Sequence, residues 1–546
     1  MQVLKPFRYE GSFLFIIIFI FRGILIKTYK LVEVIGMLIE RSSSWKEGFI
    51  QRLENHEPWN NAVLYNMSYD ITKNNLITDF TGLQSLAYLP NVKPLPHQIK
   101  AAERVIEQMN GKAILADEVG LGKTIEAGLI IKEYLLRGLV KKVLILVPAS
   151  LVNQWVEELY TKFHIPALMY KKNYELDYVD VVVMSMDTAK RSPHKEKIFA
   201  QDYDLIIVDE AHKLKNHQTI SYEFVQSLKK KFCLLLTATP IQNDTFELFY
   251  LVTLLKQGHL GNYDEFSSVF SAKNRDEERD SYLKELVSQV MVRNRRQDTG
   301  VEWSSRKIHT VPITFTANER QVYTAVSNLK QISPLFSDAF STMTLQREMC
   351  SSPDATMGTL RKKLQECKQV EEISYVENVI DQLEKLSIHS KAKKAAELIT
   401  QANEKVIIFT EYRMTQLYLS DYLYANGISN VIFNGKLSKS SREWIKHLFK
   451  QQAQVLIATE SGAEGINLQF CHHVINYDLP WNPMKLEQRI GRVHRLGQEH
   501  DVQVYNLAVK ETIDDHVMKV LQGKIETFEQ VVGELDDILE MKEQSV

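Results

Sequence analysis

Residues 113–126 read Ala-Ile-Leu-Ala-Asp-Glu-Val-Gly-Leu-Gly-Lys-Thr-Ile-Glu, and this stretch decides the fold. The apolar run at 113–116 predicts a buried strand, and Gly120 and Gly122 permit a tight turn because neither carries a Cβ. From 124 to 137 the apolar residues recur at helical spacing. A strand, a glycine turn and a helix start together predict a phosphate site, since the turn N–H groups and the helix dipole face the anion.

Two residues of the turn carry the predicted nucleotide chemistry. Lys123 is placed to reach the β- and γ-phosphates, and the Thr124 hydroxyl is placed to bind Mg²⁺. The strict pattern G-x-x-x-x-G-K-[ST] is not met, because its first glycine would fall at Asp117. Short glycine-rich strings also occur in ordinary turns, so other parts of the chain must decide between the two interpretations.

Upstream of the turn, Gln98 lies in the sequence Leu-Pro-His-Gln-Ile-Lys at 95–100. Its amide can donate to adenine and accept from it at once, and the alternative is a surface residue at a helix start. The residues predicted to bind ATP are therefore Gln98, Asp117, Gly120, Gly122, Lys123 and Thr124.

Length and composition limit the class of protein. A chain of 546 residues is long enough for two to four domains, and 45% apolar and 25% charged residues are ordinary for a globular protein. The net charge of −2 excludes a globally basic surface, so any nucleic-acid site has to be local. The four cysteines form no C-x-x-C pair, which argues against zinc and against disulfides and fits a reducing cytosol.

Apolar strands alternate with helical stretches in two parts of the chain. The predicted strands are 113–116, 143–147, 180–184, 205–208 and 232–236 in the first part, and 406–409, 431–433, 455–458, 474–477 and 502–505 in the second. This alternation predicts two parallel α/β sheets covered by helices, with ligands at the carboxyl ends of the strands. Residues 241–312 and 316–386 are polar and mostly helical in pattern, and we expect them to protrude between the two cores.

The first residues differ from the rest. The apolar run at 13–21 is short for a membrane span, and no A-x-A-like cleavage site follows it. The codons of a bacterial ribosome-binding site, GGAGGTGAT, would encode the Val-Glu-Val-Ile found at 32–35, so we expect translation to start at Met37. The expected divisions are a non-native leader (1–36), an N-terminal extension (37–88), an ATP-binding domain with a helical protrusion (89–310), a helical insertion (311–388), a second α/β domain (389–525) and an acidic helical tail (526–546).

Charged residues at two places are predicted to complete the chemistry. Asp209 ends an apolar strand, where its carboxylate can hold Mg²⁺, and Glu210 can then deprotonate the attacking water; helix capping is the alternative. Arg492 and Arg495 lie one helical turn apart, so both guanidinium groups can point toward one phosphoryl group. The alternative is a basic helix that binds backbone phosphate, a contact that Arg489 could make instead.

Taken in order, these motifs resemble those of superfamily-two helicases, and within them the Snf2-like ATPases. The stretch at 116–128 is similar to the bacterial HepA/RapA-type branch. The other matching stretches are Asp-Glu-Ala-His at 209–212, Thr-Ala-Thr-Pro-Ile-Gln-Asn at 237–243, Ala-Thr-Glu-Ser-Gly-Ala-Glu-Gly-Ile-Asn-Leu at 458–468, Trp-Asn-Pro at 481–483, and 488–498. The resemblance covers roughly residues 90–525.

The resemblance implies two tandem RecA-like α/β domains with helical insertions and an ATP site between them. It implies that Lys123, Thr124, Asp209 and Glu210 bind and hydrolyse ATP with Mg²⁺, which the threonine and the aspartate hold, and that the two arginines complete the site from the second domain. It also implies a set of residues that contact nucleic acid or relay its presence: Gln154, Trp155, Thr237, Thr239, Gly465, Asn467, Trp481, Gln488 and Arg489.

The predicted function is that of a DNA-dependent ATPase that translocates on double-stranded DNA and remodels protein–DNA complexes in a bacterial cytoplasm. One alternative is a helicase that separates DNA or RNA strands, and another is an ATP-gated factor that binds RNA polymerase. No membrane partner is expected. The polymer that stimulates ATP turnover distinguishes these three functions. Stimulation by duplex DNA favours the translocase, stimulation by single strands favours the strand-separating helicase, and stimulation by neither favours the polymerase-binding factor.

Overall fold

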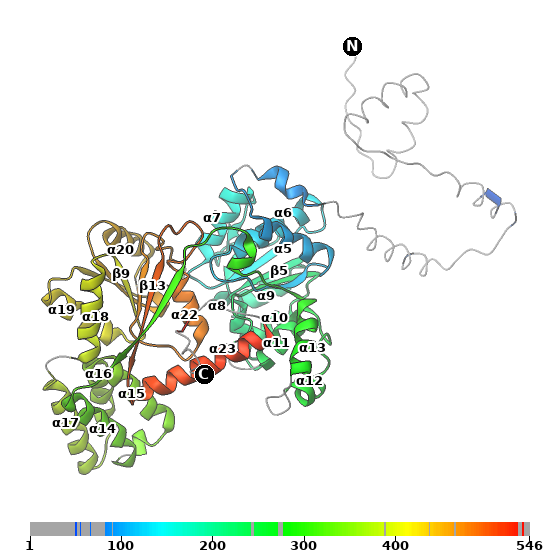
Figure 1. The fold of residues 1–546 in the computed structure, drawn as a ribbon. Coiled ribbons are helices and arrows are strands. Elements are labelled where there is room, and N and C mark those ends of the chain that lie inside the picture. The colour runs from blue at the N-terminus through cyan, green and yellow to red at the C-terminus, as the bar shows by residue number, and fades with distance from the viewer. Residues whose placement is uncertain are drawn as a thin grey trace. The chain divides into compact units, whose positions relative to one another are not determined.

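A computed structural model of the chain divides it into two units, residues 1–80 and 81–546. The structure describes residues 50–51, 55, 66, 82–89, 91–241, 245–270, 277–332, 334–386, 389–435, 437–463, 466–532 and 538–539. The predicted leader at 1–36 and most of the predicted extension at 37–88 lie outside the described residues. The second unit contains two parallel sheets with helices around them (Figure 1).

The first sheet has seven parallel strands in the order β3-β4-β2-β5-β6-β1-β7. The strands are β1 (Lys112–Leu115), β2 (Val143–Val147), β3 (Leu168–Met169), β4 (Val181–Ser185), β5 (Leu205–Asp209), β6 (Phe232–Leu236) and β7 (Met291–Val292). The strands β2, β5 and β6 consist mainly of valine, isoleucine and leucine, and all their residues are buried except Asp209 at the end of β5, as expected for a sheet covered on both faces.

The helices of the first domain connect these strands and extend beyond them. They are α5 (Pro96–Glu107), α6 (Lys123–Leu136), α7 (Val152–Phe163), α8 (Met186–Ala189), α9 (His194–Phe199), α10 (Ile220–Ser227), α11 (Thr245–Leu255), α12 (Tyr263–Phe270) and α13 (Glu277–Ser288), with short 3₁₀ turns η1 (Gln84–Tyr88), η2 (Ala211–Leu214) and η3 (Arg296–Thr299). Helix α6 begins directly after Gly122, whose backbone has a φ of 93° that suits a residue without a Cβ.

The second sheet has six parallel strands in the order β10-β11-β9-β12-β13-β8. The strands are β8 (Arg306–Ile313), β9 (Val406–Thr410), β10 (Asn430–Phe433), β11 (Val455–Thr459), β12 (His473–Asn476) and β13 (Val502–Val509). Its helices and turn are α14 (Ala317–Ile332), η4 (Pro334–Phe336), α15 (Ala339–Ser351), α16 (Pro353–Leu364), α17 (Val370–Glu384), α18 (Ser390–Ala402), α19 (Arg413–Ala425), α20 (Lys439–Gln451), α21 (Glu460–Ala463), α22 (Pro483–Ile490) and α23 (Ile513–Val531).

Helices α14 to α17 pack on one another and form a helical insertion between β8 and β9 of the second sheet (Figure 1). The last helix, α23, contacts α13 of the first domain as well as α15 and α22 of the second. Thr512 caps it, because the Thr512 side chain accepts a hydrogen bond from the Asp514 N–H at 3.2 Å. The C-terminal helix therefore joins the two domains.

All ten predicted strands are present, and apart from the longer β13 their bounds agree with the prediction within one residue. The helical interpretation of 241–312 is wrong at two places, because β7 pairs with β1 and β8 pairs with β13. Strand β8 lies at the edge of its sheet, and most of its residues are half-buried. Polar residues at 306, 307, 309 and 310 interrupt its apolar ones, so it has no long apolar run. Pairing with β13, which is remote in sequence, makes this segment a strand.

The carboxyl ends of both sheets carry the predicted functional residues. Asp209 is the last residue of β5, Thr237 follows β6, and Thr459 is the last residue of β11. Among the described residues, the structure contains no helix whose length and apolar character would allow it to cross a membrane.

Candidate active site

The phosphate loop closes around its own lysine. The Lys123 ammonium donates hydrogen bonds to the backbone oxygens of Asp117 at 2.7 Å and Glu118 at 3.4 Å. Gly120 and Gly122 hold φ angles of 97° and 93°, so the loop reaches the helix through two left-handed residues. Burial lowers the pKa of Lys123, while the charges of four nearby carboxylates act in the opposite direction. The ammonium could therefore donate to phosphate oxygens in place of these two backbone oxygens.

Gln98 contacts the loop directly. Its amide nitrogen donates to the Leu121 oxygen at 2.8 Å, and its amide oxygen accepts from the Leu95 N–H at 2.9 Å. A Cβ on Gly122 would lie 2.5 Å from that amide nitrogen, so only glycine fits beside it. Adenine recognition by Gln98 stays a prediction, and it would require the amide to leave Leu121.

Asp117 anchors the loop to the strand at the edge of the sheet. Its buried carboxylate accepts hydrogen bonds from the Asn294 backbone N–H at 2.8 Å and from the Asn294 side-chain amide at 3.0 Å. Only its backbone oxygen meets Lys123. The structure therefore gives the Asp117 side chain a positioning contact, and direct ATP binding by this residue stays a prediction.

Asp209 and Glu210 form the acidic pair at the end of β5. The Asp209 carboxylate accepts from the Trp155 indole N–H at 2.8 Å and from the Glu210 backbone N–H at 2.8 Å. Glu210 has a φ of 52°, a left-handed conformation that is uncommon for a residue with a Cβ. Such conformations persist where the surrounding structure holds them, often at functional sites. Here the backbone turn brings both carboxylates close enough to Lys123 to interact with its charge.

The two carboxyl groups have opposite pKa shifts. Burial, and then the charge of Glu210, raises the pKa of Asp209 to about 6. Burial would also raise the pKa of Glu210, but the hydrogen bond and charge of His212, together with Lys123 and Arg492, lower it to about 2. The His212 ring nitrogen lies 3.2 Å from the Glu210 carboxylate. Glu210 is therefore ionised at neutral pH, as a general base must be.

Residues of the second domain meet Glu210 across a cavity of about 100 Å³. The residues that line it are Pro148, Leu151, Gln154, Glu210, His212, Lys213, Gln488, Arg492 and Arg495. The Arg495 side chain donates to the Gly491 oxygen at 2.8 Å, and burial, followed by the charge of Arg492, lowers its pKa to about 10. The structure thus brings both predicted arginines to the predicted base.

The phosphate loop also contacts the second domain directly. A Cβ on Gly120 would lie 3.4 Å from the His494 oxygen and 3.6 Å from the Arg495 Cγ, and a Cβ on Gly491 would lie 2.3 Å from the Val119 Cγ1. The distances at Gly491 leave no space for a larger residue, whereas a Cβ on Gly120 would be at ordinary contact distance and is disfavoured by the φ of 97°. The two domains therefore meet closely at the loop that is predicted to hold phosphate.

A buried ion network, which the sequence motifs did not indicate, reinforces this contact. The Arg296 guanidinium lies 3.6 Å from the Glu118 carboxylate and donates to Glu487 of α22 at 3.1 Å. Arg306 also binds Glu487, at 2.7 and 3.1 Å, and contacts the His494 ring at 3.2 Å. Burial would raise the pKa of Glu487, but Arg306 and Arg296 hold it well below its ordinary value.

The residues predicted to contact or relay nucleic acid fall into two groups. Gln154 and Gln488 line the cavity, and Asn467 is exposed on the chain before β12. Trp155, Thr237 and Thr239 are buried, and Thr237 lies 3.4 Å from the His212 ring, so a relay is the role their position allows. Trp481 packs under the Arg347 guanidinium at 5.4 Å from the ring centre. Gly465 lies outside the described residues.

Arg489 is in a different place from the one expected. It is 3% exposed, donates to the Asp478 oxygen at 2.7 Å and to the Asn476 side chain at 3.3 Å, and lies over the Phe409 ring at 5.5 Å. The alternative in which Arg489 contacts backbone phosphate does not fit this structure, because its guanidinium belongs to the interior of the second domain, and its place among the coupling residues stays a prediction. The motif alone could not distinguish an inward from an outward arginine.

The residues present fit a magnesium nucleotide. The half-buried Lys123 side chain donates to two carbonyl oxygens, and the N-terminus of α6 lies beside it. Each Asp209 carboxylate oxygen accepts one hydrogen bond and keeps a free lone pair, and Glu210 faces the arginine-lined cavity. The arrangement can bind phosphate oxygens and a hard cation on one side and guanidinium groups on the other.

Family models and a named relative match most of the chain. Residues 97–410 match the SNF2-related domain, and residues 390–497 match the helicase conserved C-terminal domain. The chain is 56% identical over 500 residues to the uncharacterized ATP-dependent helicase YqhH of Bacillus subtilis (strain 168). The aligned residues make up 91% of this chain and 90% of that protein.

Two solved structures resemble the chain at lower identity. The Sulfolobus solfataricus SWI2/SNF2 ATPase core in complex with dsDNA is 22% identical, with a TM-score of 0.40, over 82% of this chain and 94% of its own. The Pyrococcus furiosus Hef helicase domain is 18% identical, with a TM-score of 0.48, over 77% of this chain and 97% of its own.

The chain is an ATP-hydrolysing enzyme with two tandem RecA-like domains, and the candidate active site lies where these domains meet. The chain belongs to the SNF2-related family of ATP-dependent helicases. The sequence-based prediction of this family and of the tandem RecA-like fold is confirmed, whereas the HepA/RapA-type branch stays a prediction.

Proposed function

We propose that this protein is a DNA-dependent ATPase that couples ATP hydrolysis to translocation on double-stranded DNA and thereby remodels protein–DNA complexes. The observation that carries the proposal is the cavity in which Glu210 of the first domain faces Gln488, Arg492 and Arg495 of the second. A site completed by both domains makes hydrolysis depend on their relative position, which is what coupling to movement requires.

In this proposal Lys123 and the loop N–H groups hold the β- and γ-phosphates, and Thr124 and Asp209 hold Mg²⁺, which would neutralise charge on the phosphates. Glu210 accepts the proton of the attacking water, for which its low pKa keeps it ionised. Arg492 and Arg495 stabilise the charge that develops on the transferred phosphoryl group. These roles are assigned by position and chemistry.

The path from nucleic acid to the ATP site would run through two short chains of contacts. Trp155 of α7 donates to Asp209, so a shift of the loop before α7 would move a magnesium ligand. Thr237 contacts His212, which in turn contacts Glu210, so a shift after β6 would move the base. Both chains begin at segments whose motifs resemble nucleic-acid contacts in the family. Backbone phosphate contacts there would make movement independent of sequence.

The other predicted activities lead to different outcomes in the same assay. Steady-state ATP turnover would be measured with duplex DNA, single-stranded DNA, single-stranded RNA and no polymer, in parallel with displacement of a third strand from a DNA triplex. We expect duplex DNA to stimulate turnover, and we expect ATP-dependent release of the third strand. The Glu210→Gln variant should bind ATP and duplex DNA but release nothing, which separates translocation from binding.

Three results would argue against the proposal. Stimulation that requires a free single strand, with unwinding of a forked duplex, would indicate a strand-separating helicase. Turnover indifferent to any polymer, combined with ATP-dependent capture of purified RNA polymerase, would indicate the polymerase-binding factor. Turnover stimulated by duplex without third-strand release would leave a DNA-stimulated ATPase that does not translocate. A bacterial cytoplasmic location, which the proposal assumes, is testable by cell fractionation.

A further inference from the structure

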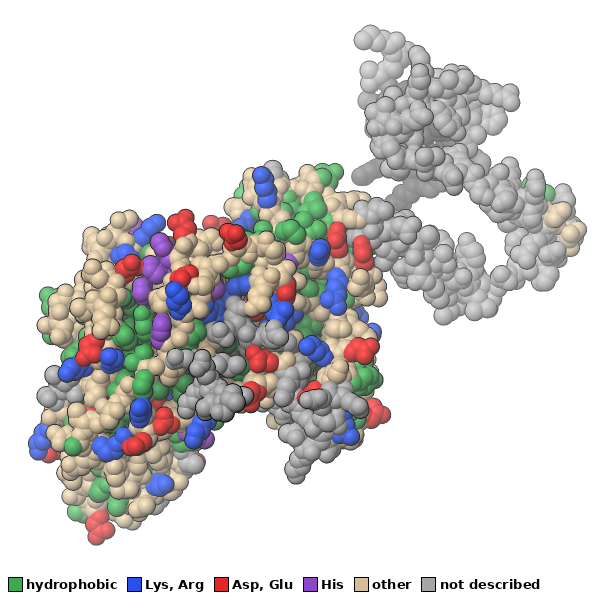
Figure 2. Space-filling model, in the orientation of Figure 1, with side chains coloured by type: hydrophobic (Ala, Val, Ile, Leu, Met, Phe, Trp, Pro, Cys, Tyr) green, Lys and Arg blue, Asp and Glu red, His purple; other side chains and the backbone are tan. Residues whose placement is uncertain are grey.

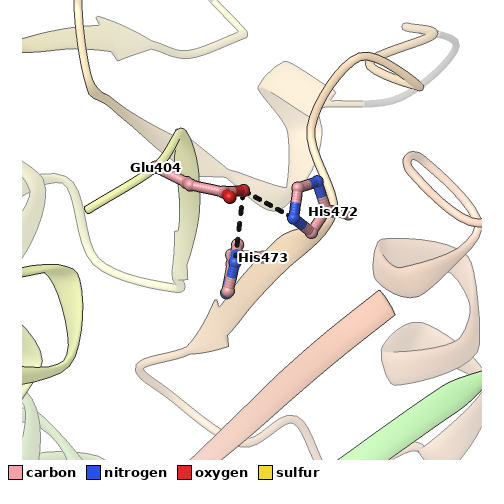
Figure 3. Close-up of side chains that lie close together, drawn as sticks. All are labelled: Glu404, His472 and His473. Atoms are coloured by element: carbon pink, nitrogen blue, oxygen red, sulfur yellow. Dashed lines mark ion pairs between the residues drawn. The ribbon is translucent and has the colours of Figure 1, made fainter. Parts of the chain in front are cut away.

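A histidine-rich cluster lies on the second domain away from the ATP site. Glu404 comes directly before β9, and His472 and His473 lie at the start of β12, the strand that pairs with β9 (Figure 3). The ligand atoms of these three side chains lie within 4.8 Å of one another. Histidine side chains gather over the second sheet in Figure 2, and the His500 ring centre is 4.8 Å from that of His472.

The three ligand atoms lie close enough together for one metal ion to reach them. The Glu404 carboxylate oxygen lies 2.6 Å from the His472 Nε2 and 3.6 Å from the His473 Nε2. In a tetrahedral zinc site with bonds of about 2.0–2.1 Å, neighbouring ligand atoms are about 3.3 Å apart. The longer distance is close to this value, whereas the shorter one is a hydrogen-bond distance that an entering ion would have to widen. Both imidazoles turn the Nε2 atom toward the same carboxylate oxygen, so an ion that replaced the proton between them could take all three atoms as ligands (Figure 3).

The two histidines differ in burial, since the His473 side chain is 11% exposed and that of His472 is 17% exposed. Among the described residues, the buried Nδ1 of His473 has no hydrogen-bond partner. An ion bound at Nε2 would therefore fix the orientation of a ring that no hydrogen bond at Nδ1 holds in place.

Neighbouring groups fit a site with an open position. A cavity of about 610 Å³ borders His472 and His473 and is also lined by His500, Asp501 and Tyr505. His500 or water could therefore complete the coordination. Cys471 is not available as a ligand, because its buried thiol donates to the Lys405 oxygen at 3.0 Å and burial raises its pKa to about 12. This agrees with a cysteine pattern that argues against thiolate zinc sites.

We propose that Glu404, His472 and His473 form a binding site for a divalent transition-metal ion of the zinc class. Two imidazoles and one carboxylate are ligands that Zn²⁺ accepts, with water or His500 as the fourth. The ion joins the chain before β9 to the chain before β12, at the amino ends of strands whose carboxyl ends face the ATP site. Its role is thus to hold together the second sheet, and it takes no part in hydrolysis.

The test is calorimetric titration of the untagged, metal-stripped full chain with ZnCl₂, together with the visible spectrum of bound Co²⁺. We expect one saturable site. Glu404→Gln, His472→Gln and His473→Gln should each weaken Zn²⁺ binding by about 100-fold or more. The matched control is His447→Gln, which changes an exposed histidine of α20 outside the cluster and should leave binding unchanged. All four variants should keep wild-type ATP turnover.

Glu404→Gln makes the test robust, because the Glu404 side chain is 51% exposed and its replacement should not prevent folding. Zn²⁺ should raise the melting temperature of the wild type and not that of this variant. Absence of saturable binding in the wild type would overturn the proposal, as would binding that survives in Glu404→Gln and His472→Gln. If His97→Gln abolished Zn²⁺ binding while the variants of Glu404, His472 and His473 kept it, the ion would belong to the other cluster, formed by His97, Asp117 and Glu126, and the proposal would be overturned.

Discussion

Gly491, just after α22, allows a direct test of whether the two domains must meet for ATP to be hydrolysed. Its backbone is helical, with φ −63° and ψ −2°, so alanine is permitted there without backbone strain. A Cβ at this position would nevertheless lie 2.3 Å from the Val119 Cγ1, 3.0 Å from the Val119 Cβ and 3.2 Å from the Glu487 oxygen. Gly491→Ala therefore acts mainly through the contact between the phosphate loop and the second domain, since the Glu487 oxygen is farther away and belongs to the same domain as Gly491.

The size of the effect follows from this overlap. Inserting a methyl group into a packed contact costs about 1–3 kcal/mol. The cost falls on the closed arrangement alone, because Val119 no longer touches position 491 once the domains separate. The population of closed domains should then drop by about 5- to 150-fold. Turnover should fall by a similar factor, whereas ATP binding by the first domain should change little.

The assay is steady-state ATP turnover at saturating duplex DNA, with calorimetry for ATP binding. Val119→Ala should restore much of the activity of Gly491→Ala, because it removes the atom at 2.3 Å and leaves a contact at 3.0 Å. Gly523→Ala in α23 is the matched control, since a Cβ there meets nothing within 4 Å. Wild-type turnover in Gly491→Ala would refute the reasoning, as would a loss that Val119→Ala does not relieve.

Four further predictions follow from the site. Glu210→Gln should keep ATP bound while turnover falls by about 10²- to 10⁴-fold, and a radioactive phosphate-release assay with near-normal rates would remove Glu210 as the base. Arg492→Ala and Arg495→Ala should leave ATP binding largely intact and lower turnover by about 10³-fold or more, with poor rescue by lysine; normal hydrolysis with lost DNA stimulation would instead make them DNA contacts. Glu487→Gln should lower the free energy of unfolding by about 3–5 kcal/mol at pH 7, measured with urea, because it removes the carboxylate that the buried Arg296 and Arg306 share. The pKa of Glu487 is depressed in the folded state, so its contribution to the free energy of unfolding is present above its unfolded pKa of about 4.3 and is lost as the pH falls below that value. The difference in the free energy of unfolding between the wild type and the variant should therefore shrink in acid, and a difference that does not change with pH would contradict the ion network. Mg²⁺-dependent ATP binding should weaken as the pH falls below about 6, since a proton then occupies the Asp209 carboxylate, and pH-independent binding from 7 to 5 would contradict that role.

The parts of the fold that were predictable are those with a local signal. Continuous apolar runs located β2, β5, β6 and β9 because strands buried on both faces need apolar residues at every position. Strand β8 lacked this signal, since it is an edge strand that β13 holds in place. The selection of Asp209 and Glu210 as candidate site residues was possible from sequence, because two acidic residues at the carboxyl end of a buried strand are seldom needed by the fold itself.

The contacts between the domains were not predictable in the same way. Arg296 is 178 residues from Glu118 and 191 residues from Glu487, and no spacing rule connects positions so far apart. The sequence motifs contain Glu118 and Gly491, but only their distances to Arg296 and Val119 show what they do. Arg489 is the opposite case, a motif arginine whose expected surface role fails because Asp478 and Asn476 hold it inside.

These contacts also explain how nucleotide could favour domain closure. A ligand shifts an equilibrium only through interactions that differ between the two states. Arg492 and Arg495 both belong to the second domain, and part of the lowered pKa of Arg495 comes from the like charge of Arg492. Glu210 of the first domain is the carboxylate of the cavity lining that lies opposite them. A phosphate group held by Lys123 of the first domain and by the two guanidinium groups of the second would be bound fully only when the domains meet, so it would stabilise the closed state more than the open one. Release of phosphate would remove the ligand that both domains share, and the closed state would lose that stabilisation.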